Sequence, residues 1–264
     1  MKAAERVSSL TVDSWPVFDE IADWFSTPLG QYVLMTEEAL LDQLLPEIFG
    51  YHLAQLSVQD RRLYQSSTIQ NKFSISMEKT ANSGVVAAPV SIPLASDSVD
   101  VVLLHHLLDY TQSHQNVLRE ISRITMPMGH VVIVGFNPVS VWGLWRTLAR
   151  LRGRAPWNGA LLRPGRLMDY LNLLDFKIDR AQYAIYGLPV ARWSDNVNDY
   201  SQGVSRRLNL PVGSVYVIVA QKQVAKKKTF RPVWPSHPAF ARLTAVQSVR
   251  RNILSSIKSS EKSF

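Results

Sequence analysis

The stretch that most constrains the fold of this 264-residue chain lies between residues 90 and 138. It contains two runs that are rich in β-branched side chains: residues 99–104, which are apolar apart from Asp100, and residues 131–134. Runs that are apolar on both faces are typical of parallel strands covered by helices on each side. Residues 115–124 place apolar side chains at helical spacing, and a Pro/Gly break follows. This order predicts one βαβ unit with a right-handed crossover.

Polar side chains follow both strands of this unit. His105, His106, Asp109 and Tyr110 come after the first strand, and Asn137 follows the second. Ligands of open α/β sheets bind beyond the carboxyl ends of the strands. We therefore expect these five side chains at a ligand-facing rim.

The same stretch resembles the second half of class I S-adenosylmethionine-dependent methyltransferases of the small-molecule type. The resemblance implies a Rossmann-like α/β fold: a mostly parallel, seven-stranded-type sheet with helices on both faces and an antiparallel last strand. It also implies S-adenosylmethionine as the cofactor. The segments that carry it are Ile92-Pro93-Leu94, Ser98-Val99-Asp100-Val101-Val102, His105-His106-Leu107-Leu108-Asp109-Tyr110, Leu118-Arg119-Glu120-Ile121 and Met128-Gly129.

The resemblance further implies roles for the rim residues. His105 and His106 would line the cleft beside the sulfonium of the cofactor, and one of them, or Asp109, would be the catalytic base. Tyr110, Asn137 and Trp142 would face a small or lipid-like methyl acceptor.

The first half of the expected site departs from that family. Residues 51–56 are the candidate first strand, and Ser57-Val58-Gln59-Asp60 follows where the family has a glycine-rich loop. Glycine suits that loop because the backbone approaches the cofactor closely and turns directly into a helix. No glycine occurs between Gly50 and Gly84. The first motif is therefore degenerate, although Asp60 can still cap a following helix.

Two further strands complete the expected cofactor site. Residues 72–77 form the candidate second strand, and Glu78 at its end can accept hydrogen bonds from a ribose diol or belong to an exposed turn. Residues 85–88 form the candidate third strand, where Ala88 occupies the position of the family's adenine-binding acid. The cofactor contacts that the resemblance implies are Gln55, Leu56, Ser57, Glu78, Ala88 and His105.

Three regions are expected along the chain: a helical cap at 1–30, a methyltransferase-like α/β domain at 31–220 and a basic tail at 221–264. In the cap, apolar residues recur at helical spacing from Phe18 to Phe25, and Pro28 with Gly30 closes the segment. A second helix is expected at 31–49. Its predicted polar side carries Glu37, Glu38 and Asp42.

Downstream of Asn137, a segment with aromatic residues on one side carries Arg146, Arg150, Arg152 and Arg154. It can dock as an ordinary helix with solvated arginines, or contact anionic lipid or an acidic substrate. A later helix at 161–174 and strands beginning at 176 and covering 215–220 resemble the end of the methyltransferase fold.

The charge of the chain is concentrated at its end. Ten Lys and Arg residues but a single acid, Glu261, follow Gln221, so this tail accounts for the net charge of +8. A basic tail can contact nucleic acid or an anionic membrane weakly, or simply be solvated.

Several classes of site are not expected. The chain has no cysteine, which excludes disulfides and thiolate chemistry. A metal site is not predicted, because neighbouring residues such as His105 and His106 point to opposite faces of an extended strand and no second ligand cluster is evident. The sequence contains neither a G-x-S-x-G nor a phosphate-loop motif. No apolar run reaches membrane-spanning length and no signal pattern is seen, so a cytoplasmic protein is expected.

Two functional hypotheses follow. The first is a methyltransferase acting on a small or lipid-like acceptor. The second is a catalytically inactive methyltransferase fold that binds protein, RNA or membrane through its basic tail.

Overall fold

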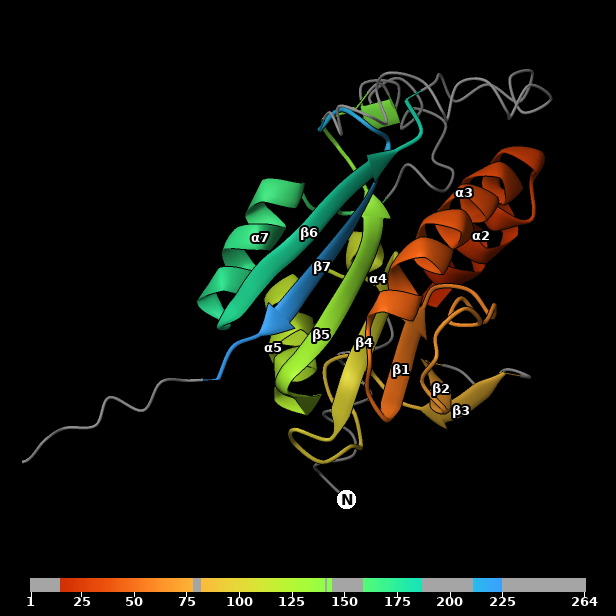
Figure 1. Ribbon diagram of the computed structural model, residues 1–264. Helices are drawn as coiled ribbons and strands as arrows, with labels where there is room; N and C mark the ends of the chain where they lie inside the picture. Colours follow the sequence, from red (N-terminus) through yellow and green to blue (C-terminus); the bar gives the residue numbers. More distant parts are fainter. Residues whose placement is uncertain (1–14, 78–81, 141, 144–158, 187–210, 225–264) are drawn as a thin grey trace, which may run out of the picture. The chain divides into compact units, whose positions relative to one another are not determined.

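A seven-stranded sheet forms the centre of the fold, with the strand order β3-β2-β1-β4-β5-β7-β6 (Figure 1). All neighbouring strands are parallel except β7, which is antiparallel to both β5 and β6. The predicted fold class, with its antiparallel last strand, is thereby confirmed. The strands are β1 His52–Ser57, β2 Asn71–Ser76, β3 Ser83–Val86, β4 Val99–His105, β5 Thr125–Phe136, β6 Phe176–Ala184 and β7 Val215–Lys222.

The computed structural model describes residues 15–77, 82–140, 142–143, 159–186 and 211–224. These residues all belong to one unit of the chain, Met1–Ala225. Glu78, the arginine-bearing segment and most of the basic tail, for which the sequence made predictions, lie outside the described residues.

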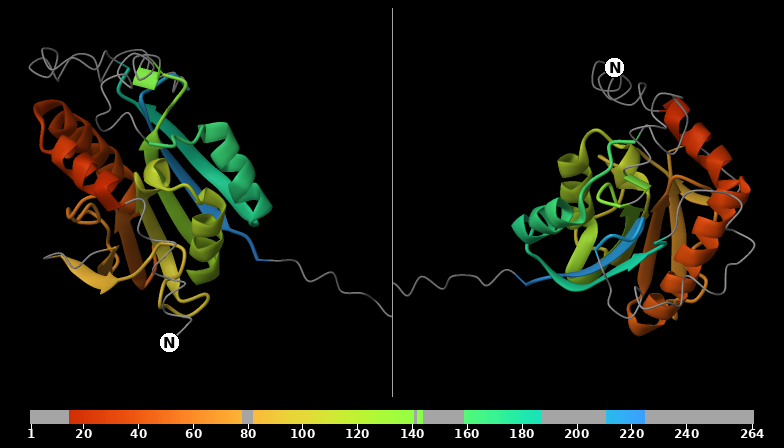
Figure 2. Two further views of the ribbon diagram at one scale, coloured as in Figure 1. Left: turned by 180° about the vertical axis from the view of Figure 1, so that it is seen from behind. Right: turned by 90° about the horizontal axis from the view of Figure 1, so that it is seen from above.

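Helices cover both faces of the sheet (Figure 2). The helices α2 Trp15–Phe25 and α3 Pro28–Leu44 pack on one face, whereas α5 His114–Ile124 and α7 Pro164–Leu173 pack on the other. Alternation along β4 explains the two cores, because successive side chains of a strand point to opposite faces. Val101 and Leu103 belong to the core under α2 and α3, and Val102 and Leu104 belong to the core under α5 and α7.

The connection between α2 and α3 is tighter than predicted. Pro28 and Gly30 do not close a segment but lie in the first turn of α3, after the N-cap Thr27. Proline is favoured at this position because its missing N–H would have no helical partner. The Thr27 hydroxyl oxygen accepts a hydrogen bond from the Gly30 N–H at 3.2 Å. A Cβ at Gly30 would overlap the carbonyl oxygen of Trp24, so glycine allows the two helices to approach.

The predicted Pro/Gly break after α5 is part of a strand. The helix ends at Ile124 and β5 begins at Thr125, so Pro127 and Gly129 lie within β5. The register of the pairing with β4 shifts in this stretch, between the pairs Val99–Thr125 and Val101–His130. Such a bulge leaves strand residues without ladder partners, which accommodates a proline.

The first half of the sheet has short connections. Residues 58–70 contain no helix, so the predicted capping role of Asp60 is wrong. The third strand begins at Ser83, two residues before its predicted start, and Ala88 lies beyond it in an isolated bridge with Ser91.

Candidate active site

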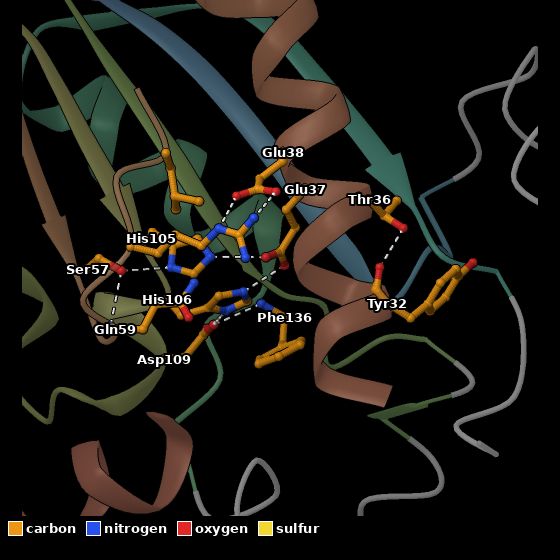
Figure 3. Close-up of polar contacts among 12 residues, drawn as sticks. Tyr32, Thr36, Glu37, Glu38, Ser57, Gln59, His105, His106, Asp109 and Phe136 are labelled. Atoms are coloured by element: carbon orange, nitrogen blue, oxygen red, sulfur yellow. Dashed lines mark hydrogen bonds and ion pairs between the residues drawn. The ribbon is translucent and has the colours of Figure 1, made fainter. Parts of the chain in front are cut away.

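The carboxyl end of β4 holds two histidines that point to the same side (Figure 3). His105 is the last residue of β4, and His106 follows with a φ of +52°, before the short helix α4 Leu107–Tyr110. The two imidazole centroids lie 4.6 Å apart. The prediction that these side chains diverge is wrong, because the extended backbone on which it depended ends at His105.

Both imidazoles bind one carboxylate, that of Glu37 in α3. His105 Nε2 lies 3.0 Å from Glu37 Oε2, and His106 Nε2 lies 2.8 Å from Oε1. All three side chains are completely buried. Glu37 therefore joins the helical layer to the rim of the sheet.

Glu37 is the site residue that the sequence interpretation missed, since it was assigned to the polar side of its helix. The signal was present in the helical spacing. Val33 and Leu34 precede Glu37 by four and three positions, and Leu41 follows it by four. All three are buried on the face that carries Glu37. A carboxylate in the middle of such an apolar stripe requires a polar partner inside the protein.

The second nitrogen of each imidazole also has a partner. His105 Nδ1 lies 3.0 Å from Ser57 Oγ at the end of β1. His106 Nδ1 lies 2.8 Å from Asp109 Oδ2, which also accepts the main-chain N–H of Phe136 at 2.9 Å. A continuous hydrogen-bonded cluster thus connects β1, α3, β4 and β5.

The pKa values within the cluster are set by burial and by the facing charges. Burial raises the pKa of Glu37, but the charge of His106 and hydrogen bonds from both imidazoles outweigh it and lower that pKa to about 2. Burial lowers the pKa of His106, but the charge of Glu37 and the bond to Asp109 outweigh it and raise that pKa to about 9. For His105, burial prevails and lowers the pKa. His105 is therefore neutral, donating through Nε2 to Glu37 and accepting the Ser57 hydroxyl proton at Nδ1.

Aromatic side chains enclose the cluster. The Phe25 ring centroid lies 5.5 Å from that of His105 and 5.4 Å from that of His106, and Phe136 lies 4.1 Å from His106. His105, His106 and Asp109 are 0% exposed. Their assignment as the catalytic base stays a prediction, because in this structure they contact one another rather than an open cleft.

The loop after β1 is held by side chains rather than by glycines. The Gln55 amide donates to the carbonyl of Arg61 at 2.6 Å and accepts the N–H of Leu63 at 2.8 Å. Ser57 Oγ accepts the N–H of Gln59 at 3.2 Å. These bonds fold the segment into a compact turn without a helix. They also occupy both ends of the Gln55 amide, a predicted cofactor contact.

A cavity of about 490 Å³ lies between α3 and this loop. Its walls come from α3, from the residues that follow β1 and from Asn82, which precedes β3, so it lies near the carboxyl end of β1. Arg61 pairs with Glu38 through contacts of 2.5 and 2.9 Å, and Asn82 donates to the carbonyl of Asp60 at 3.1 Å. The lining residues are Glu38, Asp42, Asp60, Arg61, Arg62, Leu63, Gln65 and Asn82.

The predicted cofactor contacts that the structure describes, all except Glu78, do not line this cavity. Leu56 is buried in the core under α5 and α7, and Ser57 and His105 bind each other. Ala88 is half-buried beyond β3. Gln59, however, lies beside the cavity-lining Asp60, and its buried Nε2 has no hydrogen-bond partner among the described residues.

The predicted acceptor contacts are all buried. Asn137 donates its amide to the carbonyls of Pro211 and Gly213 at 3.0 and 2.9 Å, which fixes the turn before β7. Tyr110 is 4% exposed, and Trp142, at 3%, packs edge-on against Trp24. Contact with a methyl acceptor stays a prediction for these three residues.

Comparisons with known proteins match part of the chain to a methyltransferase domain. Residues 49–133 match the protein family described as "Methyltransferase domain". The match covers about a third of the chain, and the sheet topology is that of the class I methyltransferase fold, as the sequence predicted. The domain implies S-adenosylmethionine as the cofactor.

Three individual proteins resemble this chain in fold or in sequence. A methyltransferase of Thermotoga maritima, described as a possible histamine N-methyltransferase, superimposes with a TM-score of 0.59 at 16% identity, over 78% of this chain and 95% of that chain. A methyltransferase of Archaeoglobus fulgidus superimposes with a TM-score of 0.52 at 16% identity, over 80% of this chain and 100% of that chain. Such identities show the fold alone. The uncharacterized protein YafS of Escherichia coli (strain K12) is 30% identical over 156 residues, 59% of this chain and 65% of YafS.

The described helices do not include a membrane span. Within the described part of the chain, none combines the length and the apolar composition that crossing a bilayer requires.

Proposed function

We propose that this protein binds S-adenosylmethionine in the cavity beside α3 and transfers its methyl group to a small or lipid-like acceptor in the cytoplasm. The observation that carries the proposal is the buried Nε2 of Gln59, which has no hydrogen-bond partner among the described residues and lies in the loop where the family holds its cofactor. A buried donor without an acceptor costs about 1–3 kcal/mol. A hydroxyl or carboxylate oxygen of a bound cofactor would remove that cost.

The chemistry of the cavity lining fits this cofactor. Glu38, Asp42 and Asp60 supply carboxylates that can accept hydrogen bonds from a ribose diol or an ammonium group, and Arg62 supplies a guanidinium for a carboxylate. The volume of about 490 Å³ lies within the range of about 300–1,000 Å³ that is usual for small-molecule sites.

The bound cofactor would supply a sulfonium-activated methyl group. The contribution of the chain would be to hold and orient the two reactants, since alignment lowers the barrier of such a transfer strongly. In this proposal, the cluster of Glu37, His105, His106 and Asp109 holds α3 against β4. It thereby keeps the α3 wall of the cavity in place. Proton removal by His105, His106 or Asp109 would require an opening of the cluster.

Calorimetric titration of the full chain with S-adenosylmethionine and its demethylated product tests the proposal. We expect binding by the wild type and an affinity about five- to tenfold weaker for Gln59→Leu, which loses one hydrogen bond to the ligand. Gln115→Leu is a matched control, because Gln115 is exposed on α5, across the sheet.

Two outcomes count against the proposal. Absence of binding at millimolar ligand would overturn the enzyme hypothesis, and RNA or anionic-vesicle binding by the same chain would then favour the inactive alternative. Equal affinities of wild type and Gln59→Leu would show that the ligand does not sit at this loop. Where binding is found, formation of the demethylated product with a panel of acceptors measures turnover.

A further inference from the structure

Glu37, His105 and His106 present one carboxylate oxygen and two imidazole nitrogens within 4.8 Å of one another. Two histidines and one carboxylate form a donor set that binds Zn²⁺ and other divalent transition metals. We propose that these three side chains form a binding site for one divalent transition-metal ion, through the Glu37 carboxylate and Nε2 of both histidines. This inference goes beyond the proposed methyl transfer and does not depend on it.

The two reasons for not predicting a metal site do not hold in the fold. The left-handed conformation of His106 brings the second imidazole to the side of the first. The missing third ligand comes from α3, as Glu37. Residues other than glycine rarely adopt a positive φ, and those that do are concentrated at functional sites.

The outer hydrogen bonds match those of metal-binding histidines, which usually direct their second ring nitrogen at a carboxylate, hydroxyl or carbonyl. His106 Nδ1 lies 2.8 Å from Asp109 Oδ2, and His105 Nδ1 lies 3.0 Å from Ser57 Oγ. Both rings are thereby oriented with Nε2 toward Glu37. In the metal-bound form each Nδ1 would carry the ring proton and donate it to that outer partner.

Formal charge also favours a cation. Glu37 and Asp109 place two carboxylates in a completely buried cluster, beside two imidazoles. With neutral imidazole ligands, a divalent ion balances both carboxylates. Phe25 and Phe136 surround the histidines, so the site has the dry apolar shell that strengthens ion binding.

The Glu37 oxygens would have to move slightly away from the two Nε2 atoms to admit an ion. The carboxylate oxygens lie 2.8 and 3.0 Å from the two Nε2 atoms. Bonds of about 2.0–2.2 Å to Zn²⁺ separate neighbouring tetrahedral ligands by about 3.4 Å. The ion would take the place of the Nε2 protons that now bridge to Glu37.

The test is the metal content of the untagged full chain. Because the cluster is buried, the protein is produced in medium supplemented with Zn²⁺ or Co²⁺, passed over a gel-filtration column with a weak chelator, and analysed by mass spectrometry for metal per chain. We expect about one ion per chain for the wild type and for the control variants Glu38→Gln and His130→Gln. Glu37→Gln and His105→Gln should each retain at least tenfold less.

A second readout does not depend on how well the ligand variants fold. The Co²⁺ form of the wild type should show ligand-field absorption, and the histidine ¹⁵N spectrum of the diamagnetic Zn²⁺ form should show two imidazoles bound through Nε2. Asp109→Asn and Ser57→Ala should weaken Zn²⁺ binding by about 10–100-fold, the usual effect of removing outer partners. A metal-free wild type, or metal content equal in wild type and Glu37→Gln, would overturn the proposal.

Discussion

Glu37 Oε1 and His106 Nε2 lie 2.8 Å apart in the interior, although 69 positions separate the two residues along the chain. The pair joins the middle of α3 to the turn that follows β4. Because the same carboxylate also accepts His105 Nε2, one side chain fixes the helix against both rim histidines. The placement of α3 over the sheet therefore depends on a buried polar contact as well as on apolar packing.

Replacing Glu37 by Ala should be far more costly than replacing its neighbour Glu38. Loss of the buried carboxylate leaves two enclosed imidazoles without their acceptor, which should cost about 3–5 kcal/mol of unfolding free energy. Glu38 pairs with the half-exposed Arg61, so Glu38→Ala should cost less than about 1 kcal/mol. Urea unfolding in the presence of a chelator measures both. Similar losses for the two variants would contradict a specific role for Glu37.

Gln55→Leu should loosen the loop that replaces the glycine-rich turn. The change leaves the Arg61 carbonyl and the buried Leu63 N–H without partners, at a cost of about 1–3 kcal/mol. Hydrogen exchange should quicken at the Leu63 amide before it changes in β4 or β5. The exposed Gln115→Leu serves as the control, and unchanged exchange at Leu63 would show that the loop is held by other contacts.

The sheet could be predicted from sequence because its signals are local. Apolar runs such as residues 99–104 and 131–134 identify buried parallel strands by themselves, and the spacing of α5 identifies the covering helix. The polar cluster could not be predicted in this way. It depends on one left-handed residue, His106, and on a partner 69 positions away. Neither the backbone turn nor the docking of α3 is encoded in the neighbouring residues alone.

Local signals also failed where tertiary contacts overrode them. Pro127 and Gly129 usually end structure, yet a bulge in the pairing with β4 lets them lie inside β5. Pro28 and Gly30 likewise begin α3, because the close approach of Trp24 requires a glycine in its first turn. The candidate cavity was missed because its walls come from α3 and from a loop that replaces an expected helix.

Replacement by alanine should change the stability of the protein in opposite directions at two of its glycines. A Cβ at Gly135 in β5 would lie 2.6 Å from the hydroxyl of buried Tyr216 and 3.3 Å from Asp109 Oδ1, so Gly135→Ala should destabilise the protein by about 1–3 kcal/mol. Gly165 in the first turn of α7 has no neighbour within 4 Å, and Gly165→Ala should stabilise by about 0.5–1 kcal/mol. Thermal and urea unfolding of both variants measure the contrast. A neutral Gly135→Ala would show that Tyr216 can move aside.

Acid should weaken the contact between α5 and residues 92–94. Glu120 accepts the Ile92 N–H at 2.6 Å and two hydrogen bonds from Arg123, which itself donates to the carbonyls of Ile92 and Leu94. The hydrogen bond from Arg123, assisted by the Ile92 N–H, lowers the pKa of Glu120 below its usual value of 4.5.

A carboxyl group with a lowered pKa stabilises the folded state above its unfolded pKa and loses that effect as pH falls through the folded pKa. The difference in unfolding free energy between wild type and Glu120→Gln should therefore be constant, at about 1 kcal/mol, above pH 5 and shrink steadily at lower pH. Urea unfolding of both proteins from pH 7 to pH 3 measures this difference, in which the titration of all other acids cancels. If the difference instead grew on acidification, the Glu120 carboxylate would not be the group that holds Ile92 and Arg123 in place.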